Sequence, residues 1–504
     1  MNKNNHNQLI AQFQDFRQQL HRCFKSYSDA CMDLLDALSG NTGVSSVVEL
    51  SLSPLFQRTY NSVYKAIQES FDTSRPNVDK EQKEETNKTE ETEQTKGRKE
   101  ISEKQQQNLI TVIAQLVKQP QQRDFYLFVT DTTPNPRPHA KTLQDRGYIY
   151  QPNTIKGNKP VNIGNCYSIL SLLPEKINPN DAPWSIPLSG ERIPLNSQGV
   201  DVVSNQLSIV MSDTSLPWHE QLCVLVADTA YSQRSFLLDV SKHKNLVLIA
   251  RTRSNRIFYQ SPPKEESIKR RGCPKKYGQK FNCSDSTTWH EPNQTTTVVQ
   301  TTSNGRQLTV TVQAWYQMLM RGFKDEKMYR HPFTLIRVHV TDDTNKSVWK
   351  PMWLISIGQR HQEISPLIAY QSYRQRFDIE HFNRFGKQRL LMNEFQTPEV
   401  SHEENWIRLV LLAYVQLFAA KDLAQHLPRP WERYLQQNHD KIVTPSAVQR
   451  DFQRIISQIG KPGRSPKPRG NSTGRVVGQT QPKRSKHPVV KKGNKTNNIK
   501  NKAA

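Results

Sequence analysis

The chain has 504 residues and a formal net charge of +24 at pH 7, which leaves room for about two or three domains and favours a polyanionic partner. Its six cysteines are few and scattered, which argues against a disulfide framework and suits a reducing cytoplasm. No apolar run is long enough to span a bilayer, and the N-terminus lacks the apolar core of a signal peptide, so we expect a soluble, intracellular protein.

Helical patterns open the chain. Apolar residues recur at helical spacing over residues 8–38, and a second pattern runs from Pro54 to Phe71, which together predict an N-terminal helical domain over residues 1–72. Residues 73–106 are mostly Glu, Lys, Thr and Gln, so they cannot bury a core and we expect a disordered linker there.

Two short strand patterns each end in an aspartate. The run from Phe125 to Asp131 is continuously apolar and β-branched before its acid, and Leu222 to Asp228 repeats the pattern. Either aspartate alone is typical of a turn or a cap. With the patterns around these two runs, the expected order is three strands, helix, strand, helix and strand, which is the order of the RNase H-like fold. The further elements are strands at 147–151, 161–170 and 245–252 and helices at 202–211 and 232–242. We therefore expect residues 107–252 to form the first part of such a catalytic domain.

A basic, β-rich insertion is expected over residues 253–365. Its segment Arg270–Gly278 resembles a minor-groove hook, but Cys273 stands where such a hook usually has arginine, so contact with the DNA backbone is the safer expectation. The residues expected to make that contact are Arg271, Lys275 and Lys276. Two tryptophans just before the last helices, Trp349 and Trp353, have faces that could stack on an unpaired base, with packing in the insertion core as the alternative.

The stretch Tyr373–Lys387 carries the most informative spacing in the chain. Read as one helix at about 100° per residue, it buries Phe382 and Phe385 on one side. Within an arc of roughly 60° on the other side it gathers four polar residues: Tyr373, Arg376, Glu380 and Lys387. Such a face can hold a metal through the carboxylate and a phosphate through the cations, although a solvated amphipathic helix is the plainer alternative.

The spacing Tyr-x2-Arg-x3-Glu-x6-Lys resembles the signature of the DDE-type insertion-sequence transposases. The resemblance implies an α/β fold: an RNase H-like mixed sheet flanked by helices, interrupted by the β-rich insertion and preceded by the helical domain. The last catalytic helices would occupy residues 366–460. It implies that Asp131, Asp228 and Glu380 bind two Mg²⁺ ions, with Mn²⁺ as a substitute. It also implies that three residues bind DNA phosphates near the cut: Tyr373, Arg376 and Lys387.

The implied function is a transposase that cleaves the ends of a mobile DNA element and joins them to target DNA by hydrolysis and transesterification. Its partners would be double-stranded DNA, as inverted-repeat ends and as target, and a second copy of the chain on paired ends. No membrane is involved, and a bacterial, nucleoid-associated location is expected. Two alternatives remain: an inactive transposase-derived DNA-binding protein, or a host nuclease on the same fold.

The two flanks of the chain are interpreted by analogy. The family places a helical DNA-end-binding domain at the N-terminus, while helices that only pack on the catalytic core are an equal alternative. From Lys461 onward there are 13 Lys or Arg and no Asp or Glu, so residues 461–504 are expected to be a disordered basic tail.

Overall fold

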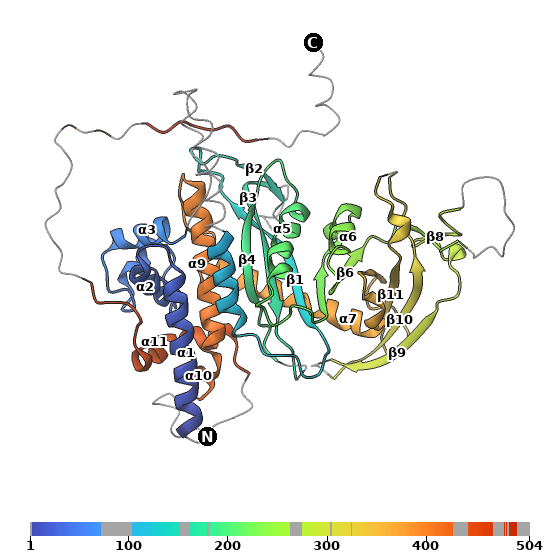
Figure 1. Cartoon of the computed structure of the whole chain (residues 1–504), viewed down its shortest axis with the longest axis horizontal. Coiled ribbons are helices and arrows are strands. Elements are labelled where there is room, and N and C mark those ends of the chain that lie inside the picture. The colour runs from blue at the N-terminus through green and yellow to red at the C-terminus, as the bar shows by residue number, and fades with distance from the viewer. Residues whose placement is uncertain are drawn as a thin grey trace, which may run out of the picture.

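The computed structural model describes residues 3–71, 103–150, 161–178, 181–262, 275–302, 305–323, 325–426 and 442–466, together with 478, 480 and 483–490. In this part of the chain, ten strands form one mixed sheet and two more form a small antiparallel pair (Figure 1). The strands are β1 (Tyr126–Pro136), β2 (Gly147–Tyr150), β3 (Val161–Leu173), β4 (Ile186–Ile193), β5 (Cys223–Ala227), β6 (Leu246–Thr252), β7 (Ile257–Tyr259), β8 (Lys280–Asn282), β9 (Gln294–Thr301), β10 (Gln307–Met318), β11 (Phe333–Thr341) and β12 (Met352–Ile357).

The large sheet has the order β2-β3-β1-β5-β6-β12-β11-β10-β9, and β4 pairs with β3 beside β2. Three strands at its centre, β1, β5 and β6, run parallel to one another, while the other pairs are antiparallel. Every residue of β5 is buried, which explains why the sequence of this strand is a continuous apolar run. Antiparallel strands leading into three parallel ones, flanked by helices, form the RNase H-like fold that the sequence predicts.

Strands from the β-rich segment continue the same sheet. β12 pairs with β6, with Ile355 opposite Ala250, and β11, β10 and β9 follow in antiparallel order. An aromatic cluster fills the core at this end, and its neighbouring rings lie 5.1 to 6.1 Å apart between centroids: Phe281, Trp289, Trp315 and Trp353. The segment that the sequence marked as an insertion therefore widens the catalytic sheet.

Helices pack against this sheet and against one another. α5 contacts β3 and β4, α7 contacts β5, β6 and β10, α8 contacts β1, and α9 contacts β4. A further helix, at residues 103–114, begins inside the linker expected over residues 73–106, so the last four residues of that range are helical; residues 73–102 lie outside the described residues. The labelled helices are α1 (Lys3–Cys23), α2 (Ser28–Ser39), α3 (Tyr60–Glu69), α5 (Gly199–Ser212), α6 (Arg234–Val240), α7 (Pro366–Gln375), α8 (Phe377–Arg389), α9 (Val400–Ala419), α10 (Lys421–His426) and α11 (Pro445–Ile459).

The N-terminal helices lie against α9, at the end of the molecule opposite β9 and β10 (Figure 1). Arg17 and Asp36 form a fully buried ion pair at 2.5 Å, and Arg17 also donates to Gln416 of α9 at 2.9 Å. Ser39 donates to the Ala413 carbonyl at 3.2 Å. The first helical region thus shares a core with the catalytic part, while binding of DNA ends by this region stays a prediction.

In the two flanks of the chain, the structure differs from the sequence-based expectations. The helical pattern over residues 8–38 is two helices, broken near Tyr27, whose φ of 53° is left-handed. The helix expected from Pro54 starts only at Tyr60. Parts of the expected disordered tail contact the folded body, since His487 N–H bonds the Lys141 carbonyl at 2.9 Å. No helix in the described ranges is both long and apolar enough to cross a membrane.

Candidate active site

Asp131 and Asp228 occupy equivalent positions on neighbouring parallel strands. Val129 of β1 is paired with Val226 of β5, and each aspartate lies two residues further along its strand direction. Because side chains alternate across a strand, residues two apart point to the same face. Asp131 is inside β1, whereas Asp228 directly follows β5 and accepts a hydrogen bond from Ala230 N–H at 2.8 Å. The two carboxylates therefore lie at the same level on adjacent parallel strands, where β5 ends and β1 continues; we call this place the carboxylate edge.

The third carboxylate comes from α8, which packs on β1. Glu380 lies in the first turn of this helix, and Asn383 follows it by three residues, on the same side of the helix. Asn383 Nδ2 donates to Asp131 Oδ2 at 3.3 Å, so this face of α8 is held against the strand that carries Asp131. The amide thus links the helix with the third acid to the strand with the first.

The stretch predicted as one helix is two helical segments that meet at Arg376. α7 ends at Gln375 and α8 begins at Phe377. Arg376 N–H bonds the Tyr373 carbonyl at 3.1 Å and Ile379 N–H bonds the Arg376 carbonyl at 3.2 Å, both over three residues and tighter than α-helical bonds. The polar face remains continuous through this junction.

Arg376 lies among the acids. Its Nη2 pairs with Glu380 Oε1 at 2.7 Å, and its guanidinium carbon is 5.7 Å from the Tyr373 ring centroid and 5.1 Å from that of Phe377. The arginine is 8 % exposed, while the Glu380 side chain is 44 % exposed. A buried guanidinium is thus the counter-ion of the third carboxylate.

The pKa of Asp131 depends on the charges of the other two acids. Burial is the largest effect and raises the pKa of Asp131 to about 6. The Arg376 charge lowers this pKa, the Asp228 and Glu380 charges raise it, and the Thr132 N–H bond at 2.9 Å lowers it. A carboxyl group that resists ionisation beside two other acids is typical of a site that receives a cation.

Tyr373 and Lys387 border the same site. Burial raises the pKa of Tyr373, which is 3 % exposed, and the nearby Asp228 charge acts in the same direction. Burial lowers the pKa of the half-buried Lys387, while the Asp131 charge raises it. Tyr373 thus lies within the electrostatic influence of Asp228, and Lys387 within that of Asp131, while their roles at the site stay a prediction.

As they stand, the side chains do not form a ready chelating cluster. Across the described ranges, no three His, Cys, Asp or Glu side chains are placed to hold one metal ion together. The donor set nevertheless suits a hard cation such as Mg²⁺, because all three candidates are carboxylates and Asp131 is poorly neutralised. Arg376 pairs with Glu380 Oε1, so coordination through both oxygens of this carboxylate would require that ion pair to open.

Residues 16–322, more than half of the chain, match the model of a family described as DDE superfamily endonuclease. The chain belongs to this family. The match includes Asp131 and Asp228 but ends before α7 and α8, so it does not extend to Glu380 or to the Tyr-Arg-Glu-Lys spacing. No curated protein matches the chain.

Membership of the DDE superfamily endonucleases indicates a transposase- or nuclease-type function on DNA. The other residues predicted to contact DNA lie in the β-rich segment. Trp349 is 60 % exposed, whereas Trp353 is 3 % exposed and packed in the aromatic cluster, so only Trp349 presents a free face in this conformation. Lys275 is exposed, and Lys276 lies 4.9 Å above the Tyr329 ring. Arg271 lies outside the described residues.

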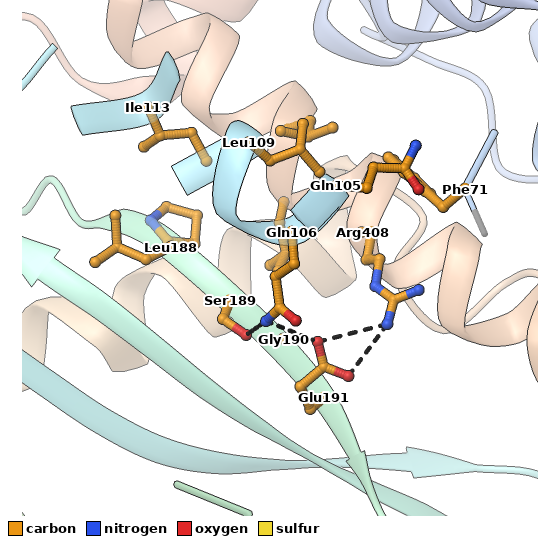
Figure 2. A pocket seen from close by; sticks show the side chains of 13 residues that line it. Phe71, Gln105, Gln106, Leu109, Ile113, Leu188, Ser189, Gly190, Glu191 and Arg408 are labelled. Carbon is orange, nitrogen blue, oxygen red and sulfur yellow. Dashed lines mark hydrogen bonds and ion pairs between the residues drawn. The ribbon is translucent and has the colours of Figure 1, made fainter. Parts of the chain in front are cut away.

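A cavity elsewhere in this DDE superfamily endonuclease is too small for a substrate. Figure 2 shows it between the helix at residues 103–114, β4 and α9, where Gln106 donates to Ser189 and Glu191, and Arg408 pairs with Glu191. Its volume of about 50 Å³ suits a water molecule or two. This cavity therefore offers no room for a DNA substrate.

Sequence reasoning missed two supports of the site. Asn383 could have been found, because it lies one turn after Glu380 on the same face. The second is the fully buried Glu403 of α9, which gives no signal in sequence. Its carboxylate accepts four hydrogen bonds of 2.8 to 3.1 Å from residues on or just after β1 and β3: Asn135, Arg137, Asn165 and Tyr167.

Proposed function

We propose that the chain is a metal-dependent DNA transposase, which cleaves the ends of a mobile element and joins them to target DNA. Asp131, Asp228 and Glu380 would bind two Mg²⁺ ions, with Mn²⁺ as a substitute. The observation that carries this proposal is the equivalent placement of the two aspartates on β1 and β5, with α8 bonded to Asp131. Family membership supports the reaction class, because the matched region includes both aspartates.

The bound ions would activate the attacking oxygen and stabilise the leaving oxygen of the phosphodiester. The protein residues have distinct tasks around them. Asp131 and Asp228 supply hard oxygen donors from a rigid sheet edge. Glu380 would join them on release from Arg376, and the freed guanidinium would donate to a DNA phosphate through two N–H groups. The Lys387 ammonium and the Tyr373 hydroxyl would contact phosphates at the border of the site.

The DNA partners follow from this chemistry. Inverted-repeat ends and target DNA would both cross the carboxylate edge, and a homodimer would hold two ends together. The net charge of +24 supports a polyanionic ligand and a location on the nucleoid. Trp349 would stack on an unpaired base beside the cut, and Lys275 and Lys276 would contact the backbone.

A cleavage assay tests the proposal. The substrate is a duplex that carries the inverted repeat bracketing the gene, with Mg²⁺ present. The wild-type chain should cleave at the repeat end, and Asp228→Asn and Glu380→Gln should each reduce cleavage by at least about a thousandfold, since each removes a carboxylate donor to the ions. The exposed Asp343→Asn is the matched control and should cleave normally. Wild-type rates in the two site variants would overturn the assignment.

One observation favours a second candidate function, a DNA-binding protein without catalytic activity. The Arg376–Glu380 ion pair at 2.7 Å engages one oxygen of the third acid. If that pair were permanent, the chain would bind DNA without binding Mn²⁺ at millimolar concentration. A host nuclease on the same fold would instead cleave DNA with no preference for inverted-repeat ends, so comparing repeat-bearing and scrambled duplexes separates it from the transposase.

A further inference from the structure

A second, positively charged recess opens beside Asp228. It has a volume of about 460 Å³ and is formed by the two loops that follow β5 and β6. Because β1, β5 and β6 are parallel neighbours in that order, this recess lies at the same carboxyl edge as the two aspartates, displaced by one strand spacing of about 4.8 Å. Clefts at the carboxyl ends of parallel strands are preferred ligand sites in α/β proteins. Its lining residues are Thr229, Ala230, Ser232, Gln233, Arg253, Asn255 and Arg256.

The polar groups of the recess suit an anion. Two arginines line it, and no described acidic side chain forms an ion pair with either. Arg253 and Asn255 are exposed, so they can move to meet a ligand, while Arg256 is fixed by its bond from Nη2 to the Ser232 carbonyl at 3.2 Å. A guanidinium held by a hydrogen bond beside an exposed one, with a hydroxyl and an amide nearby, offers the donors that a phosphate group accepts.

The nearby acid does not neutralise this recess. Glu326 pairs with Arg234 at 2.7 Å, and the Arg234 guanidinium stacks 4.2 Å from the Phe323 ring centroid, so that carboxylate is already engaged. Burial lowers the pKa of Arg256, and the Arg234 and Arg253 charges lower it further. Three guanidiniums face the paired Glu326 and the adjacent Asp228 carboxylate. The local charge therefore stays positive by one unit, which a bound anion would relieve.

We propose that this recess, through Arg253 and Arg256, binds the backbone phosphate of the DNA strand that neighbours the phosphate held at Asp131 and Asp228. The inference rests on the proposed function, because it requires a DNA strand at the carboxylate edge. A strand that crosses this edge from β1 towards β6 meets the acids first and the two arginines next. The recess would therefore fix the register of the strand relative to the acids without reading base sequence.

The test is equilibrium binding of DNA by the full-length chain, measured by fluorescence anisotropy across a salt series with EDTA present. Loss of one phosphate contact should reduce the slope of log K against log salt concentration by about 0.9. Arg253→Ala should show this reduction, and Arg253→Lys, which keeps the charge, should retain most of the slope. Thermal melting of each variant confirms that the fold is intact.

A matched control separates this effect from general loss of charge. Lys244 is exposed and precedes β6, whereas Arg253 follows it, so Lys244→Ala removes a positive charge from the opposite edge of the sheet. Lys244→Ala should leave the slope unchanged. If Arg253→Ala and Lys244→Ala have equal slopes, or if Arg253→Ala loses affinity for inorganic phosphate while keeping the DNA slope, the proposal is overturned.

DNA in which one phosphate is replaced by an uncharged methylphosphonate shows which phosphate Arg253 contacts. A single methylphosphonate is moved along the strand around the cleaved phosphate. At one neighbouring position it should weaken binding to the wild-type chain several-fold and should have no further effect on Arg253→Ala. Equal effects in both proteins at every position would overturn the proposal while leaving the transposase assignment intact. A wild-type chain that binds no DNA at all would overturn both.

Discussion

Arg376 Nη2 lies 2.7 Å from Glu380 Oε1, and the same guanidinium is close enough to Asp131 to lower the pKa of that carboxyl. The charge of this one buried arginine therefore stabilises the ionised form of two of the three acids that the proposed reaction needs. This arrangement partly balances the negative charge of the acids, and it implies that the arginine and divalent ions would compete for the same carboxylates.

Removing that arginine should strengthen metal binding. Arg376→Ala frees Glu380 and removes a positive charge beside Asp131, so affinity for Mn²⁺ in the absence of DNA should rise several-fold, corresponding to about 1 kcal/mol for a partly exposed ion pair. DNA cleavage should fall in the same variant, because the proposed phosphate contact is lost. Titration of Mn²⁺ followed by electron paramagnetic resonance measures the first effect.

The matched control is Arg374→Ala. Arg374 is exposed two residues earlier and donates to Gln300 at 2.6 Å, away from the acids. Its loss should leave Mn²⁺ affinity unchanged. An Arg376→Ala protein with the wild-type affinity for Mn²⁺ would show that the arginine and the metal do not compete.

Asp131→Asn should stabilise the metal-free protein above pH 6. The pKa of Asp131 is about 6 in the folded chain, against roughly 3.9 for an unperturbed aspartate, so the folded state binds the proton more tightly. Stability therefore falls as pH rises from about 4 to about 6, and the ionised carboxylate costs roughly 3 kcal/mol at most above that range. A neutral amide avoids this cost.

Urea unfolding at several pH values measures this gain. The difference between Asp131→Asn and wild type should be largest at pH 7 to 8 and should shrink towards pH 4. The exposed Asp343→Asn should change stability by less than about 0.5 kcal/mol at every pH. A gain that stays constant with pH would show that ionisation of Asp131 is not its cause.

The sequence predicts the central strands well, because their physics is local. β1 and β5 begin as apolar runs that are each followed by an acid. This pattern locates both strands, and the resemblance to the transposases is needed to single out Asp131 and Asp228. The sequence does not predict the junction at Arg376, because the helical spacing of side chains continues through it. Only the backbone hydrogen bonds change there, from a span of four residues to a span of three. Pairing of β12 with β6 is also hidden, because it depends on partners far apart in the chain.

Trp349 and Trp353 show the same limit at the level of single side chains. They are four residues apart and chemically identical, yet one is exposed and the other lies in the aromatic core. The burial of Glu403 is not predictable from the sequence either, because nothing in the sequence around α9 distinguishes its carboxylate from a solvated one. Burial of a particular side chain depends on the whole tertiary structure.

The two tryptophans should therefore respond differently to truncation. Trp353→Ala removes a core ring and should lower the free energy of unfolding by about 3–5 kcal/mol. Trp349→Ala should leave that free energy nearly unchanged and should weaken binding of DNA with an unpaired base at its end by about 1–3 kcal/mol. Urea unfolding and anisotropy measure the two effects, and a stability loss in Trp349→Ala with no change in DNA affinity would contradict the assigned roles.

The buried carboxylate of Glu403 should be a strong structural determinant. Glu403→Ala leaves the Arg137 guanidinium buried without its partner and should lower the free energy of unfolding by about 3–5 kcal/mol. The exposed pair of Arg484 with Glu399 provides the comparison, and Glu399→Ala should cost at most about 1 kcal/mol. Equal losses in the two variants would show that the buried network is not the stabilising element.

The most direct test of the central claim is Mn²⁺ binding by the full-length chain, followed by electron paramagnetic resonance. The wild-type chain should bind Mn²⁺ at or below millimolar concentration, and Asp131→Asn, Asp228→Asn and Glu380→Gln should each reduce affinity by at least about tenfold, equivalent to 1.4 kcal/mol. Affinity that stays at the wild-type level in all three variants would contradict a shared metal site at these carboxylates.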